Sequence, residues 1–117
     1  MQLKDIDLLD EITDIYNDTI DVGVELADGT CYTICVATPQ YFVEKMKDEK
    51  TDYIEPGSPT IIVKKLTEEV VRDAIGAYAE NDAYWLKLYQ FANVIDISIL
   101  NKIQYEDRKE WEKEWED

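Results

Sequence analysis

An alternation of apolar and polar positions dominates the first third of the chain. In residues 20–26 every second residue is apolar, and Asp21, Gly23 and Glu25 lie between them; this period of two predicts a strand with one buried face. The Asp28-Gly29 dipeptide that follows is typical of tight hairpins. Residues 30–36 then predict a second, antiparallel strand. The side chains expected to face the core are Ile20, Val22, Val24, Leu26, Tyr32, Ile34 and Val36.

The stretch before this hairpin fits two structures. Within residues 3–16 the helix alternative rests on the spacing of Leu8, Ile12, Ile15 and Tyr16, which fit one helix face. The strand alternative rests on Ile12, Asp14 and Tyr16, which are spaced as on one face of a strand. We favour a strand at residues 11–16, because a turn-forming cluster, residues 17–19, comes next. The result is a three-stranded meander with one exposed face. The acidic residues expected on or beside that face are Asp14, Asp21, Glu25 and Asp28, and together with Asp18 of the turn they are candidates for contact with a partner.

Two capping patterns predict helices after the meander. Thr38 followed by Pro39 is typical of a helix N-terminus. A β-branched run at residues 60–65 predicts a buried strand, and Thr67 then caps a second helix. The apolar side of the first helix comprises Phe42, Val43 and Met46, and that of the second Val70, Val71, Ala74, Ile75 and Tyr78.

The last part of the chain is rich in aromatic residues. Residues 81–82 interrupt the second helix, and residues 84–91 hold four aromatic side chains and a single charge, which predicts a segment that closes the core. Residues 94–97 fit either a short strand or the start of a helix capped by Asp96 or Ser98. Residues 100–117 favour a helix with a charged tail at 106–117. Its Trp111 and Trp115 would dock on this domain or on another chain.

These elements predict one α+β domain that spans residues 1–117. We expect a small antiparallel sheet, formed by the meander and a later strand, packed against two to four helices. A chain of 117 residues is the usual size of a single domain, and its apolar content of 45% is that of a globular protein.

Charge narrows the choice of partner. The chain carries 27 acidic against 12 basic residues, a net charge of -15, and from Asp5 to Asp28 there are nine acids and no base. Such a field repels phosphate backbones and anionic membranes, which disfavours binding to nucleic acid or to membranes. It attracts a basic protein partner and speeds its association. Solubility alone is the competing explanation.

Known catalytic and metal-binding motifs are absent from the sequence. With no histidine, Ser-His-Asp and Cys-His catalysis and histidine-bearing zinc sites are excluded. No glycine-rich phosphate loop and no calcium loop occurs. Cys31 and Cys35 would lie about 13 Å apart on one strand, too far for a disulfide, and we interpret them as small core residues. We therefore expect a protein that is not an enzyme and has no cofactor and no metal.

The N-terminal residues do not form a signal peptide, and no apolar run approaches the roughly 20 residues of a membrane span. These observations, with the two unpaired cysteines, predict a cytoplasmic protein.

Three segments carry a resemblance to known proteins: residues 37–46 (ATPQYFVEKM), 53–75 (YIEPGSPTIIVKKLTEEVVRDAI) and 82–91 (DAYWLKLYQF). They resemble a group of small, uncharacterised bacterial α+β proteins. In size, acidity and layout the chain also resembles immunity proteins of bacterial toxin systems, including contact-dependent inhibition. This second resemblance rests on general form and assigns no functional residue.

The sequence therefore predicts an acidic protein that neutralises a basic partner, in the manner of an immunity protein that inhibits a toxin such as a nuclease. The alternative is a structural or regulatory adaptor that self-associates through its C-terminal helix. Besides the acidic residues of the meander, the candidate partner-binding residues are Tyr84, Trp85 and Tyr89.

Overall fold

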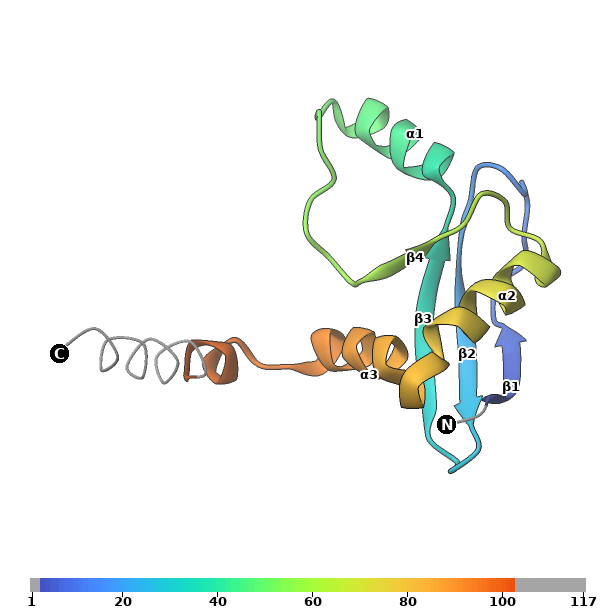
Figure 1. Ribbon diagram of the computed structural model, residues 1–117. Helices are drawn as coiled ribbons and strands as arrows, with labels where there is room; N and C mark the ends of the chain where they lie inside the picture. Colours follow the sequence, from blue (N-terminus) through green and yellow to red (C-terminus); the bar gives the residue numbers. More distant parts are fainter. Residues whose placement is uncertain (1–2, 103–117) are drawn as a thin grey trace, which may run out of the picture.

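The computed structural model describes residues 3–102. In chain order its elements are β1 (Leu3–Leu8), β2 (Thr19–Leu26), β3 (Cys31–Ala37), α1 (Pro39–Glu49), β4 (Thr60–Ile62), α2 (Glu68–Tyr78) and α3 (Glu80–Val94) (Figure 1). This confirms the predicted α+β fold, with a meander and a later strand. Within residues 3–102, no helix has the length and apolar character needed to cross a membrane.

The four strands lie in the order β1-β2-β3-β4. The pairs β1/β2 and β2/β3 are antiparallel, but β3 and β4 are parallel, so the expected antiparallel sheet is in fact mixed. The reason is the connection. Parallel neighbours need a crossover, and here α1 and the loop after it carry the chain from the end of β3 back to the start of β4 (Figure 1).

The central hairpin forms as predicted. Val22 lies opposite Ile34, and Val24 lies opposite Tyr32. In the turn, the Leu26 N–H donates to the Thr30 carbonyl at 2.9 Å, and Gly29 has a φ of 88°, which favours glycine. The register therefore places the alternating apolar residues of both strands on one face of the sheet.

The first strand is not where we predicted it. It is β1, and residues 11–16 form a loop instead. The loop is held by side chains that compete with strand pairing. The Asp18 carboxylate accepts hydrogen bonds from the Thr13 N–H at 3.0 Å and hydroxyl at 3.1 Å, and Asp14 accepts one from the Tyr16 N–H at 2.9 Å.

Helix α2 covers one face of the sheet (Figure 1). Its Thr67 cap is confirmed, since the hydroxyl accepts a hydrogen bond from the Val70 N–H at 3.3 Å. Leu66 before the cap and Val71 after it are both fully buried, as expected of a hydrophobic staple. The core comprises Ile6, Ile20, Val22, Val24, Leu26, Ile34, Val36, Ile61, Val63, Leu66, Val71, Ile75, Ala79, Ala83 and Leu86.

Helix α1 has the predicted cap but contributes no buried residue to the core. The buried Thr38 hydroxyl accepts hydrogen bonds from the Tyr41 N–H at 3.3 Å and the Asp18 N–H at 3.4 Å. On the apolar side of the helix, Val43 is exposed, because the helix lies beyond the end of the sheet (Figure 1). Strand β4 is also shorter than predicted and ends at Ile62.

The break after α2 is a left-handed turn in which Asn81, Asp82 and Ala83 all have a φ between 55° and 61°. Helix α3 then contacts β3 and leads away from the sheet (Figure 1). After Val94 the chain resumes a helix at residue 97, and the Asp96 carboxylate caps it by accepting from the Ser98 N–H at 2.9 Å. The segment 94–97 is thus no strand. The predicted tail with Trp111 and Trp115 lies outside the described residues.

Candidate functional site

The sheet has one face packed against helices and one open face. The register places Asp5 opposite Glu25, Asp7 opposite Gly23, and Asp21 opposite Cys35. These side chains belong to the face opposite the core, and none of them is buried. We call this surface the open face, and its residues are Asp5, Asp7, Asp21, Gly23, Glu25, Cys31, Thr33 and Cys35.

Two of the predicted binding residues lie on the open face. Within the described residues, no hydrogen bond or ion pair engages the Asp21 carboxylate. Glu25 forms an ion pair with Lys4 at 3.5 Å, an exposed pair that stabilises the fold by less than about 1 kcal/mol. Both carboxylates are therefore available to a partner at little cost.

Asp5 and Asp7 are functional candidates that we did not predict. They lie on β1 and add two carboxylates to the open face, directly across from β2. The signal was present in residues 5–8, where Asp and an apolar residue alternate. The strand predicted at residues 11–16 does not include these residues.

The open face contains a shallow hollow of about 390 Å³. Gly23 forms part of its floor, and the exposed side chain of Leu9 lies beside it, 3.6 Å from where a Cβ atom on Gly23 would stand. Carboxylates of Asp5, Asp7 and Glu25 line the rim. An apolar wall next to several carboxylates matches the aliphatic stem and charged head of a lysine or arginine side chain.

The other predicted acids, Asp14, Asp18 and Asp28, lie in turns, where their carboxylates accept hydrogen bonds from the backbone. Burial raises the pKa of Asp18, but hydrogen bonds from Thr13 and Thr19 outweigh it and hold the pKa below its ordinary value of 3.8. The Thr30 N–H, which donates to Asp28 at 2.9 Å, lowers the pKa of that carboxyl. These residues shape the loops around the open face and add to its negative field.

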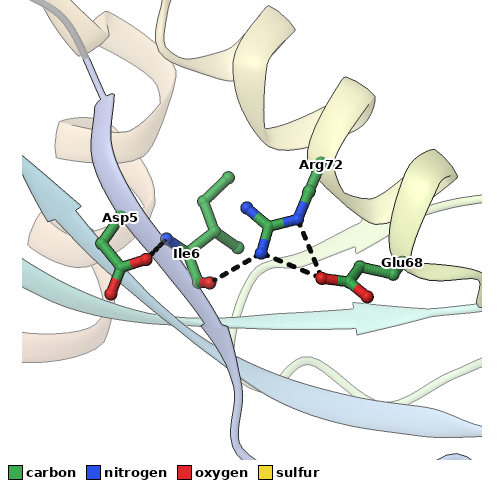
Figure 2. Close-up of polar contacts among 4 residues, drawn as sticks. All are labelled: Asp5, Ile6, Glu68 and Arg72. Atoms are coloured by element: carbon green, nitrogen blue, oxygen red, sulfur yellow. Dashed lines mark hydrogen bonds and ion pairs between the residues drawn. The ribbon is translucent and has the colours of Figure 1, made fainter.

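The outer edge of the sheet is capped at β1. Figure 2 shows that the Ile6 N–H donates to the Asp5 carboxylate at 2.9 Å and that the Ile6 carbonyl accepts from the Arg72 guanidinium at 3.3 Å. Glu68 holds the guanidinium in place at 2.9 and 3.1 Å. Edge strands with unpaired backbone groups recruit further strands, and this cap occupies those groups in the middle of β1. A partner therefore has less access to this edge than to the open face.

The three candidate aromatic residues lie on α3, away from the open face. The rings of Tyr84 and Trp85 meet edge to face, with centroids 5.2 Å apart. Tyr89 packs instead against Tyr78, with centroids 5.5 Å apart, and burial together with the Tyr78 hydroxyl raises its pKa. The predicted set is therefore divided between the sheet and the helix.

The interpretation of the cysteines as core residues is wrong. Both thiols are free, with Cys31 exposed and Cys35 half-buried on the open face. Among residues 3–102 there is no group of three or more acidic or cysteine side chains placed to hold a metal ion. Every buried side-chain nitrogen or oxygen in this range has a hydrogen-bond partner.

Comparison with protein-family models, with curated proteins and with solved structures finds no match for this chain.

Proposed function

We propose that this chain is an acidic binding protein that neutralises a basic protein partner through the open face of its sheet. An immunity protein that inhibits a toxin such as a nuclease is the specific form of this function. The observation that carries the proposal is an uncovered sheet face with four carboxylates: Asp5, Asp7, Asp21 and Glu25. Lys4 pairs with Glu25, and the sequence from Asp5 to Glu44 contains no lysine or arginine to offset the other three.

The arrangement of these charges supports binding better than it supports stability. Asp5 and Glu25 are directly opposite across two strands, where like charges destabilise a sheet by about 0.2–1 kcal/mol. A fold selected for stability alone gains nothing from this pair. A partner with a basic surface relieves the repulsion when it binds, so the pair contributes to affinity.

The geometry also favours binding across the face rather than addition of a strand. The β1 edge is capped by Arg72, and β4 at the other edge has only three residues. The open face, in contrast, offers the hollow beside Gly23 for a basic side chain. Carboxylates in this position mimic the phosphates that a nuclease binds, which would block the active site of such a toxin.

Co-purification tests this proposal. The tagged chain is co-expressed with the product of the adjacent upstream gene, and the pair is isolated at low and at high salt. We expect a complex at low salt that weakens as salt rises, and loss of the partner's toxic activity in the complex. Absence of a complex at low salt contradicts the proposal.

Matched variants then locate the interface. The face variant carries Asp7→Asn, Asp21→Asn and Glu25→Gln; the control variant carries Glu55→Gln, Glu69→Gln and Asp73→Asn, three exposed acids on other surfaces. Both change the net charge by the same amount. The face variant should lose the complex and the control should keep it, whereas equal weakening of both would mean that only total charge matters.

A further inference from the structure

Helix α3 is apolar on two opposite sides. Leu86 faces the core and is fully buried. Tyr84, Leu88 and Phe91 fall within about 60° of one another on the other side of a helix with 3.6 residues per turn. Their side chains are 55%, 39% and 49% exposed. We call Tyr84, Leu88 and Phe91 the outer stripe.

The outer stripe is part of a larger apolar surface. Neighbouring Trp85 is 48% exposed, and further along the chain Val94, Ile97, Ile99 and Leu100 are also exposed. The side chains of Tyr84, Trp85 and Phe91 are each about half exposed and together present about 300 Å² of surface. That is roughly a third of what one partner contributes to a standard protein interface. A contiguous exposed apolar surface of this kind is typical of a protein–protein interaction site, so the second apolar side of α3 is a candidate interface.

The shape of the molecule keeps this surface away from the core. The Cα atoms have a radius of gyration of 17.8 Å, against about 13 Å for a compact domain of 100 residues. Figure 1 shows the cause, since α3 and the helical segment after it lead away from the sheet. The sheet therefore does not cover the outer stripe, and a second molecule has room to pack along it.

Charge identifies the kind of molecule that fits. From Ala83 to Ile95 the only charged residue is Lys87, and its ammonium already contacts the Asp82 carboxylate at 3.1 Å. A basic partner gains nothing here, because its attraction is to the acids of the open face. Two copies of this chain, each with a net charge of -15, repel one another everywhere except at a surface free of acids. An uncharged apolar stripe is also complementary to itself across a two-fold axis.

We propose that the outer stripe of α3 is a homodimer interface, in which α3 of one chain packs against α3 of a second copy. Because α3 lies on the helical side of the sheet, both open faces stay accessible in the dimer. This inference does not depend on the proposed function. It concerns the outer stripe of α3, whereas the alternative function drawn from the sequence uses the charged C-terminal helix.

Sedimentation analysis of the full chain over a wide concentration range tests the dimer. The stripe variant, Leu88→Glu with Phe91→Glu, should be monomeric, with a dissociation constant raised by at least about a hundredfold. The control, Val43→Glu with Ile62→Glu, changes two residues that are 51% and 60% exposed on α1 and β4. It adds the same charge and should remain dimeric. Circular dichroism verifies that both variants are folded.

Salt separates this inference from the proposed function. Raising the salt concentration screens the repulsion between two acidic chains, so the dimer should tighten while binding of a basic partner weakens. A wild-type chain that is monomeric at all concentrations would overturn the inference. A stripe variant that remains dimeric, or a control that dissociates equally, would do so as well.

Discussion

Replacing Gly23 with alanine separates stability from binding on the open face. Gly23 lies within β2, where glycine weakens a strand because it has the largest conformational freedom in the unfolded chain. A Cβ atom there would lie 3.6 Å from the nearest Leu9 carbon and 3.7 Å from the Asp7 carbonyl oxygen, both ordinary contact distances. The backbone does not have a positive φ, so alanine causes no strain.

The expected gain in the free energy of unfolding is about 0.5–1 kcal/mol, which raises Tm by about 4 °C in a domain of this size. Gly29→Ala is the matched control, since Gly29 has a φ of 88° and alanine there should destabilise the fold by about 1 kcal/mol. Urea and thermal unfolding measure both changes. Opposite signs are expected for the two substitutions.

The same Gly23→Ala variant should bind the basic partner about tenfold more weakly, because its methyl group occupies the floor of the hollow. A substitution that stabilises the fold but weakens binding indicates that the native residue is retained for function. If Gly23→Ala lowers the free energy of unfolding, the hollow is not open in the folded protein and the reasoning fails. If it stabilises the fold without any effect on binding, the hollow is not part of the interface.

Two further predictions concern the acids and the edge of the sheet. The pKa of Asp18 is lowered in the folded protein, so the stabilisation by its carboxylate is complete above pH 3.8 and is lost as the pH falls through the folded pKa. Asp18→Asn should therefore be less stable than wild type by about 1 kcal/mol at neutral pH and no less stable in strong acid. Urea unfolding at a series of pH values measures this difference. A constant difference at every pH would refute this. Arg72→Met removes the hydrogen bond to the Ile6 carbonyl but keeps the aliphatic stem, and should lower the free energy of unfolding by about 0.5–1 kcal/mol and speed amide exchange along β1. An Arg72→Met protein with unchanged exchange would show that the cap does not protect this edge.

Local signals in the sequence were sufficient for much of the fold. The hairpin was predictable because apolar alternation and a turn dipeptide agree on one register, so residues 20–36 have few alternatives. Thr38 and Thr67 were recognisable as caps because the hydrogen bond they accept is local, from an N–H three residues later. These elements depend on neighbours in the chain rather than on distant contacts.

The predictions that were wrong have different physical causes. Strand β4 pairs in parallel because of where α1 returns the chain, which no residue of β4 determines. Hydrogen bonds to the Asp14 and Asp18 side chains hold residues 11–16 in a loop, although Ile12, Asp14 and Tyr16 have the spacing of one strand face. Cys35, in contrast, was predictable: it alternates with Ile34 and Val36, which face the core, so it belongs to the open face.

Some of the candidate site residues were predictable from the sequence, and others were not. Asp21 and Glu25 follow from the alternation in β2, which also places their side chains on the open face. Asp5 and Asp7 join them only through the pairing of β1 with β2, a contact across about twenty residues of sequence. The exposure of the outer stripe follows from the direction that α3 takes after its left-handed turn, which periodicity alone does not determine.

The most direct test of the central claim is the rate at which the captured partner associates with the wild-type chain and with the two triple variants, measured at about 0.05 and 0.5 M salt. We expect the variant at Asp7, Asp21 and Glu25 to associate at least about tenfold more slowly than wild type at low salt, and this difference to shrink at high salt. The control at Glu55, Glu69 and Asp73 should stay close to wild type. Equal rates for the face variant and wild type at low salt would contradict the claim that the open face is the binding surface.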